Sequence, residues 1–136
     1  MVVAIGAREV VEFRVTEGEM DAFRRLSGDI NPLHDDAEFA RRRGFEGVVV
    51  YGGLIVAQVS RLLGTRVPGR GCVWRSVSLR FRNPLYVGEL AQLSGVVVHS
   101  NDDLGVADLK ISVVAGGRRV AEGEAAVLLA RERADA

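Results

Sequence analysis

Hydrophobic residues form four runs in the second half of the chain. Hydrophobic and polar residues alternate over residues 72–81, and residues 89–100, 104–115 and 118–130 are three long runs rich in valine. Alternation with a period of two is typical of β-strands that have one buried face. Asn101-Asp102-Asp103 and Gly116-Gly117 separate the last three runs and predict hairpin turns. The pattern therefore predicts four consecutive antiparallel strands, followed by a tail from Arg131 that is expected to fray.

The first half of the chain begins with one strand and one helix. Residues 10–15 form a mainly apolar run with strand character. Thr16 and Glu19 have the spacing of a capping box, in which each side chain binds the backbone N–H of the other residue. Ser27-Gly28 is a typical helix end. We therefore expect a helix that starts after Thr16 and stops at Ser27-Gly28.

Two further helices are expected before the strands begin. Asp35 or Asp36 is suited to cap a short helix that includes residues 38–43 and ends at Gly44. Residues 52–64 carry apolar side chains on every side of a helix. A helix that is apolar all round is normally buried all round. Its expected length of about 20 Å is enough to cross a curved sheet.

The order of these elements indicates an α+β fold. One strand, helices and then four antiparallel strands predict a curved antiparallel sheet wrapped around a central buried helix. The chain has 136 residues and a mass of 14.7 kDa, so we expect one domain over residues 1–136.

Charge and cysteine content narrow the range of functions. The 18 basic residues balance the 18 acidic ones, which argues against nucleic acid or an anionic membrane as the main partner. Cys72 is the only cysteine, so no intrachain disulfide or cysteine-based metal site is expected, and Cys72 is expected to pack in the core. No run approaches the ~20 apolar residues of a membrane span, and no signal-peptide pattern is present. A cytoplasmic protein is therefore expected.

The segment from Asp29 to His34 carries the most informative chemistry. It places a carboxylate and an imidazole on either side of Asn31-Pro32. Pro32 fixes its own φ and biases Asn31 away from helix, and the Asn31 side chain is suited to brace the turn. An acid and a base on one stiff loop are suited to activate a water molecule.

This segment resembles a known family. The run Ser27-Gly28-Asp29-x-Asn31-Pro32-Leu33-His34, closed by Ala40, is similar to the signature of the MaoC-like (R)-specific enoyl-CoA hydratases, or hydratase 2 family, which adopt a hot-dog fold. The likeness continues through residues 52–54, 60–64 and 79–88. It implies reversible hydration of a trans-2-enoyl thioester to an (R)-3-hydroxyacyl thioester, with no cofactor. Two histidines and no cysteine cluster give no ligand set, so no metal site is expected. The implied acyl carrier is coenzyme A or an acyl carrier protein.

The resemblance also implies roles for individual residues. In the family, the aspartate and the histidine together hold the water that is added or lost, which implies this role for Asp29 and His34. Asn31 would orient the loop. The backbone N–H of Gly52 would bind the thioester carbonyl, with close packing as the alternative reason for this glycine. Ser60 aligns with a serine near the active site, and on a buried helix its hydroxyl needs a backbone carbonyl or a polar active-site group as partner.

The sequence departs from the family on both sides of Gly52. The usual pattern is His-Gly-Met, whereas this chain has Tyr51-Gly52-Gly53. Tyr51 keeps a hydrogen-bonding tip on a larger ring, and Gly53 is expected to open space near the acyl group. Both are candidates for the substrate pocket. Leu63 is a further candidate, although a core role suits it better. These changes indicate a specialised acyl substrate.

Two other functions remain open at this stage. Hot-dog proteins include thioesterases, and the altered segment around Gly52 is also compatible with a non-catalytic subunit. The retained Asp29 and His34 favour the hydratase. A single curved sheet leaves open edges, so we expect a homodimer or a higher homo-oligomer.

Two remaining features lie outside the family motif. Arg41-Arg42-Arg43 either forms a solvated helix end or meets the phosphates of coenzyme A or an acidic carrier protein. His99 has no motif around it and is expected at the surface.

Overall fold

Five strands and four helical segments lie within residues 3–130, the part of the chain that the computed structural model describes. In chain order they are β1 (Arg8–Phe13), α1 (Glu17–Ser27), the 3₁₀ helix η1 (Pro32–His34), α2 (Ala37–Arg42), α3 (Gly52–Thr65), β2 (Val73–Phe81), β3 (Ala91–Asn101), β4 (Val106–Ala115) and β5 (Arg118–Leu128). The tail from Arg131, which is expected to fray, lies outside the described residues. Within these residues, no helix combines the length and the apolar character that crossing a membrane requires.

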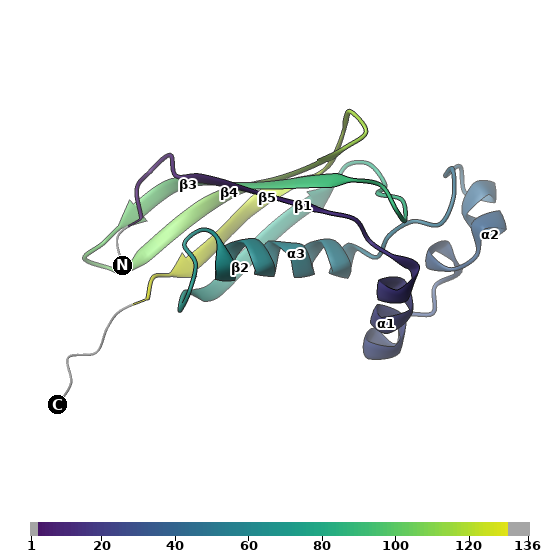
Figure 1. Ribbon diagram of the computed structural model, residues 1–136, viewed down its shortest axis with the longest axis horizontal. Helices are drawn as coiled ribbons and strands as arrows, with labels where there is room; N and C mark the ends of the chain where they lie inside the picture. The colour runs from purple at the N-terminus through teal and green to yellow at the C-terminus, as the bar shows by residue number, and fades with distance from the viewer. Residues whose placement is uncertain (1–2, 131–136) are drawn as a thin grey trace.

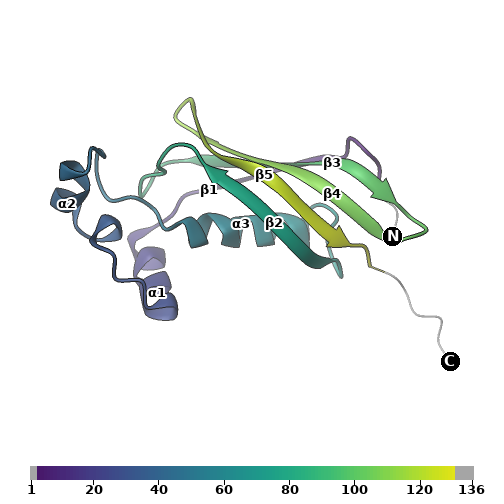
Figure 2. The same ribbon diagram turned by 180° about the vertical axis from the view of Figure 1, so that it is seen from behind.

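The strands form one antiparallel sheet in the order β1-β3-β4-β5-β2. The two predicted hairpins join β3 to β4 and β4 to β5. Figures 1 and 2 show the sheet curving over α3, while α1 and α2 lie together at one end of the molecule. Alternate residues of β3 and β4 are buried and join residues of α3 in the core. The predicted α+β arrangement of a curved sheet around one long helix is confirmed.

The position of β2 differs from what the chain order suggests. This strand follows α3 but pairs with β5 at the edge of the sheet, instead of with β3, the next strand along the chain. The alternation of its apolar residues predicts one buried face, yet Val73, Val77 and Phe81 are 55%, 39% and 53% exposed. An edge strand has a neighbour on one side only, so these residues lack a full covering layer.

The long helix α3 is buried on one face only. Ile55, Val59 and Leu62 are at most 2% exposed, whereas Ala57 and Ser60 are exposed. The prediction of a helix buried on all sides is therefore wrong for the single chain. The reason is geometric, because one sheet covers only the side of the helix that faces it.

The local signals around α1 and α2 are confirmed. Thr16 Oγ1 accepts a hydrogen bond from the Glu19 N–H at 3.1 Å, and Glu19 Oε1 accepts one from the Thr16 N–H at 2.9 Å. Gly28 ends α1 with a φ of +74°, a left-handed conformation that glycine adopts without strain. Of the two candidate caps for α2, Asp36 accepts the hydrogen bond, from the Phe39 N–H at 3.0 Å.

Strand β1 begins and ends two residues earlier than the hydrophobic pattern predicts. Its pairing with β3 starts at Arg8, which lies opposite Val96. Backbone hydrogen bonds do not depend on side-chain polarity, so the ladder includes polar residues that a hydrophobic pattern excludes.

An ion pair joins the β2–β3 connection to β5. Both carboxylate oxygens of Glu89 accept hydrogen bonds from the Arg118 guanidinium, at 2.7 and 3.2 Å. Arg118 also donates to the Pro84 carbonyl at 3.0 Å. The bonds from Arg118 lower the pKa of Glu89 below its ordinary value.

The variant Glu89→Gln is expected to lower the free energy of unfolding at neutral pH by up to about 1 kcal/mol, because Arg118 loses its charged partner. Folding lowers the pKa of Glu89, so the ion pair stabilises the protein above about pH 4.3, and this contribution is lost as the pH falls through the lowered value. Urea unfolding of both proteins across this range measures the difference. A difference that stays constant into acid would contradict the assignment.

Candidate active site

The loop from Asp29 to His34 is held by its own side chains. Asp29 Oδ1 accepts a hydrogen bond from the Asn31 N–H at 3.0 Å, and Asn31 Oδ1 accepts one from the Leu33 N–H at 3.1 Å. Asn31 thereby caps η1, with Pro32 at the first position of that helix. The prediction that Asn31 braces this turn is confirmed.

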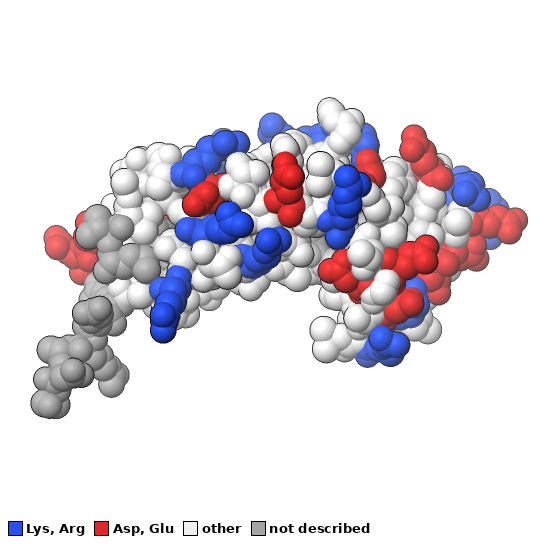
Figure 3. Space-filling view, viewed as in Figure 1, with Lys and Arg blue, Asp and Glu red and all other residues white. Residues whose placement is uncertain are grey.

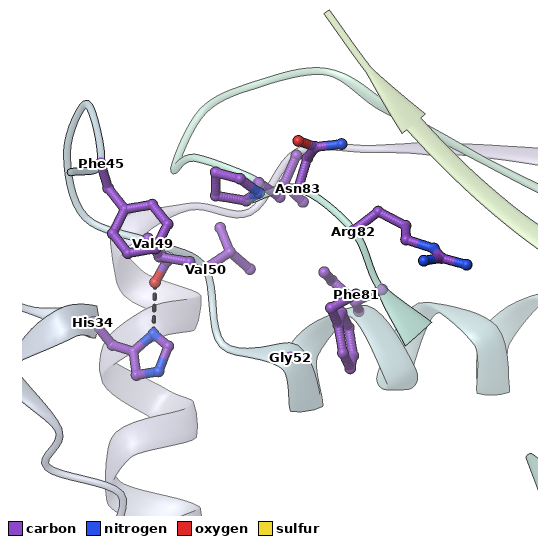
Figure 4. Close-up of a pocket in the computed structure, with 11 residues that line it drawn as sticks. His34, Phe45, Val49, Val50, Gly52, Phe81, Arg82 and Asn83 are labelled. Carbon is purple, nitrogen blue, oxygen red and sulfur yellow. Dashed lines mark hydrogen bonds between the residues drawn. The ribbon is translucent and has the colours of Figure 1, made fainter. Parts of the chain in front are cut away.

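The His34 imidazole is half-buried and has a fixed orientation. Its Nδ1 lies 2.7 Å from the Val49 carbonyl oxygen, as the dashed line in Figure 4 shows. Because a carbonyl oxygen only accepts hydrogen bonds, Nδ1 carries a proton and Nε2 is the nitrogen left for a ligand. The ring also stacks on Tyr51, with the ring centres 4.1 Å apart and 27° between the planes.

A cavity of about 380 Å³ opens beside His34. Its apolar wall includes Phe45, Val49, Val50, Ile55, Phe81 and Leu85. His34 and Gly52 line the same cavity, so the structure brings together two of the three predicted catalytic residues. Figure 4 draws both on its wall, with the Phe81 ring beside Gly52. An apolar space with a few polar groups is suited to an acyl chain that has one polar end.

Gly52 is the first residue of α3, where backbone N–H groups have no acceptor within the helix. Among the described residues no side chain caps this helix, so the N–H groups of its first turn have no side-chain acceptor. The positive end of the helix dipole lies at the same point. A Cβ at residue 52 would lie 3.2 Å from Phe81 Cζ, so close packing also favours glycine here.

Asp29 is exposed and does not line this cavity in the single chain. Its backbone carbonyl accepts a hydrogen bond from the Tyr51 hydroxyl at 2.7 Å. Since the Tyr51 ring stacks on His34, one side chain links both loop residues. Within residues 3–130, Asp29 Oδ2 makes no hydrogen bond, which leaves this oxygen for a water molecule.

Tyr51 and Gly53, which the sequence analysis names as candidates for the substrate pocket, do not line the cavity beside His34. Tyr51 is 1% exposed and is directed at the loop instead of the cavity. Gly53 packs against Phe23, because a Cβ at residue 53 would overlap the Phe23 ring. The space that Gly53 is expected to open is therefore filled. Sequence reasoning missed Phe23 and Phe81, since contacts between distant residues leave no local pattern.

Leu63 and Ser60 also lie outside the cavity wall. Leu63 is 1% exposed and belongs to the core, in agreement with its alternative role. Ser60 is exposed, so the expectation of a buried hydroxyl is wrong. Its exposure follows from the uncovered face of α3 described above.

A second cavity, of about 370 Å³, lies on the α1 side of His34. Glu17, Asp21, Arg24 and Asp35 line it and make it strongly polar. In Figure 3, acidic side chains gather at this end of the molecule, where Figure 1 places α1 and α2. His34 therefore lies between an apolar and a polar cavity, and water can reach its ring from the polar side.

The other candidates have general roles in this structure. Arg42 pairs with Glu38 at 3.2 Å, and the Arg41-Arg42-Arg43 cluster is exposed and lines neither of these two cavities. His99 is exposed on β3. Cys72 is half-buried, its thiol donates to a backbone carbonyl of α3 at 3.2 Å, and burial raises its pKa. A thiol with a raised pKa is a packing group and a weak nucleophile.

The chain is similar in sequence to one protein family and to several hydratases and dehydratases. A family model described as "MaoC like domain" matches residues 6–116. An (R)-specific enoyl-CoA hydratase from Aeromonas caviae is 35% identical over 92% of this chain and 94% of its own length. A 3-hydroxybutyryl-CoA dehydratase from Methylorubrum extorquens is 30% identical over 96% of this chain and 84% of its own length. A mitochondrial 3-hydroxyacyl-(acyl-carrier-protein) dehydratase from Arabidopsis thaliana is 42% identical over 57% of this chain, and the match spans 46% of that protein.

The fold of this chain is also similar to that of a solved structure. The solved structure of an (R)-hydratase from A. caviae matches this chain with a TM-score of 0.88 and 34% identity, over 93% of this chain and 97% of that one. This similarity confirms the hot-dog fold that the motif around Asp29 and His34 implies.

Proposed function

Because the chain belongs to the MaoC-like family of hydro-lyases, we propose that it is an (R)-specific hydratase or dehydratase of trans-2-enoyl and (R)-3-hydroxyacyl thioesters. The observation that carries this proposal is the position of His34 and Gly52 on one apolar cavity, with Asp29 linked to His34 through Tyr51. The names of the relatives support the same reaction class.

Asp29 Oδ2 and His34 Nε2 are the two groups proposed to hold the water. In hydration, the water oxygen bonds to Cβ, the Asp29–His34 pair accepts one proton from the water, and the pair returns one proton to Cα. Because both groups are proposed to contact the same water, this proton is assigned to the pair and not to either residue. Dehydration follows the same steps in reverse.

The backbone N–H of Gly52 is the proposed donor to the thioester carbonyl oxygen. Addition of water at Cβ moves electron density onto this oxygen and gives it enolate-like charge. A fixed donor stabilises that charge more than it stabilises the neutral carbonyl, and such donors commonly contribute ~10²–10³ in rate. The thioester itself acidifies Cα, so the scheme uses no cofactor.

The acyl chain is proposed to occupy the apolar cavity beside His34. Either coenzyme A or an acyl carrier protein would carry it. Both carriers occur among the relatives, since two of their names specify coenzyme A and one specifies an acyl carrier protein.

Parallel assays on crotonyl and butyryl thioesters, each on coenzyme A and on an acyl carrier protein, test this function. We expect the enoyl absorbance of the crotonyl thioesters to fall, with no release of free thiol. The saturated butyryl thioesters are the control, because a thioesterase can hydrolyse them and a hydratase has no double bond to act on. Release of free thiol from both the crotonyl and the butyryl thioesters, without hydration, would contradict the hydratase proposal and show that the protein is a thioesterase.

The active form is proposed to be a homodimer or a higher homo-oligomer. β2 is an edge strand with exposed apolar residues, Val73, Val77 and Phe81, and one face of α3 is uncovered. An apolar edge strand favours pairing with a second copy of the chain. Phe81 also lines the cavity, so pairing along β2 would support one wall of the site.

The variant Val77→Lys is expected to convert the oligomer into a monomer and to lower its activity, because a lysine on an edge strand opposes pairing. Leu104→Lys is the matched control, since Leu104 is 67% exposed in the turn between β3 and β4. Size-exclusion chromatography with light scattering measures the mass of each protein. A wild-type protein that is monomeric and fully active would rule out the proposed assembly.

A further inference from the structure

Tyr51 lies between the two loop residues that the proposed reaction uses. Its hydroxyl donates to the Asp29 carbonyl at 2.7 Å, and its ring stacks on the His34 imidazole with ring centres 4.1 Å apart. The residue is 1% exposed, and it lines neither cavity beside His34. Contact with substrate or solvent therefore does not explain a tyrosine at this position.

Tyr51 is supported in turn by Phe23 of α1. The two ring centres are 4.7 Å apart, with 42° between the planes. Glycine at residue 53 lets Phe23 take this position, since a Cβ there would overlap its ring. Phe23, Tyr51 and His34 thus form a row of three rings that connects α1, the start of α3 and the loop.

We propose that Tyr51 is a positioning residue, whose hydroxyl fixes the backbone of Asp29 and whose ring fixes the plane of His34. Phe23 and Gly53 are its support. The catalytic consequence rests on the function proposed above, whereas the contacts themselves do not. The arrangement relates the two departures from His-Gly-Met at residues 51 and 53. The Phe23 ring backs the tyrosine, and the same ring lies where a Cβ at residue 53 would be.

The hydroxyl and the ring make separable contributions. Asp29 is also held by the end of α1, where Ser27 Oγ accepts its N–H, and by the Asn31 N–H of its own loop. The Tyr51 hydroxyl adds a bond from the start of α3 to the Asp29 carbonyl. The stack limits rotation of the imidazole, so that Nε2 keeps one direction. Both effects preorganise the groups that hold the water, and neither contributes to substrate binding.

Kinetics of two variants test this separation. Tyr51→Phe removes only the hydroxyl, and Tyr51→Leu removes the ring as well. We expect kcat to fall about tenfold and about a hundredfold, respectively, with KM changed less than about twofold, because displaced groups slow the reaction without altering substrate contacts. Tyr86→Phe is the matched control: the Tyr86 hydroxyl accepts a hydrogen bond from the Glu46 N–H at 3.0 Å, and its loss should leave kcat unchanged.

Proton NMR of the imidazole signals tests the stacking without any turnover. The chain has two histidines, so His99→Gln assigns the signals of His34. A stacked aromatic ring shields the protons above its face. The His34 signals are therefore expected upfield of those of the exposed His99 in the wild type and in Tyr51→Phe, and they should move downfield in Tyr51→Leu.

Wild-type kcat in Tyr51→Phe, or unmoved His34 signals in Tyr51→Leu, would overturn the proposal. A raised KM with unchanged kcat would also overturn it, because that result makes Tyr51 a substrate contact. If the wild type hydrates no enoyl thioester, the proposed function fails, and the NMR signals still decide whether Tyr51 orients His34.

Discussion

Asp29→Asn and His34→Ala are each expected to lower the rate of enoyl-thioester hydration by about 10³-fold or more while leaving the fold intact. Asp29→Asn keeps an oxygen to accept the Asn31 N–H, so the loop persists while the charge that is proposed to hold the water is lost. His34→Ala removes Nε2 from a half-buried ring on the cavity wall. Both residues lie in a loop outside the main core, so neither change should unfold the protein.

Steady-state kinetics with crotonyl thioester and thermal unfolding measure these effects. Asp108→Asn and His99→Gln are matched controls, since both residues are exposed on strands. Wild-type turnover in either loop variant would remove that residue from the mechanism. A similar loss of activity in the controls would show that the assay reports general damage to the fold.

Gly52→Pro is expected to lower kcat by about 10²–10³-fold relative to Gly52→Ala. Proline lacks the N–H but fits the first position of a helix. Tyr51 has φ −57° and ψ 130°, a conformation that a residue before proline readily adopts. Alanine keeps the N–H and adds the same Cβ, which would lie 3.2 Å from Phe81 Cζ. The comparison therefore matches the added Cβ, and the two variants differ in the N–H that the proline ring replaces.

Circular dichroism of the two Gly52 variants checks that α3 still forms, and kinetics with crotonyl thioester give their kcat values. Equal kcat in the two variants would contradict a role for the Gly52 N–H. Close packing against Phe81 would then be the reason for the glycine.

Short-range chemistry explains the parts of the fold that the sequence predicts well. The capping box of Thr16 and Glu19 and the Asn31 turn each join residues a few positions apart, so their spacing reveals them. The hairpin turn at Gly116-Gly117 is equally local, because both glycines adopt a positive φ there.

Long-range pairing explains what the sequence did not predict. Alternation shows that residues 73–81 have an apolar face, but it does not identify the neighbouring strand, and β2 pairs with β5. The apolar character of α3 similarly predicts burial without saying what buries each face. One sheet covers only part of this helix, and Ser60 is exposed as a result.

The same limit applies to the candidate site. Asp29 and His34 are candidates because a short motif carries them, and Gly52 is a candidate because of the family resemblance. Their surroundings depend on Phe23 and Phe81, which reach the site from α1 and β2. Tyr51 is expected in the pocket because it adjoins Gly52, yet the chain turns into α3 at this point and the tyrosine is directed at the loop.

The configuration of the product formed from a crotonyl thioester tests the central claim most directly. In the proposed mechanism, Asp29 and His34 hold the water on one face of the Cα=Cβ bond, while the Gly52 N–H fixes the thioester carbonyl. Chiral chromatography of the 3-hydroxybutyryl product should give the (R) enantiomer from the wild type and no product above background from His34→Ala. An (S) or racemic product, or one that His34→Ala forms equally well, would contradict this account.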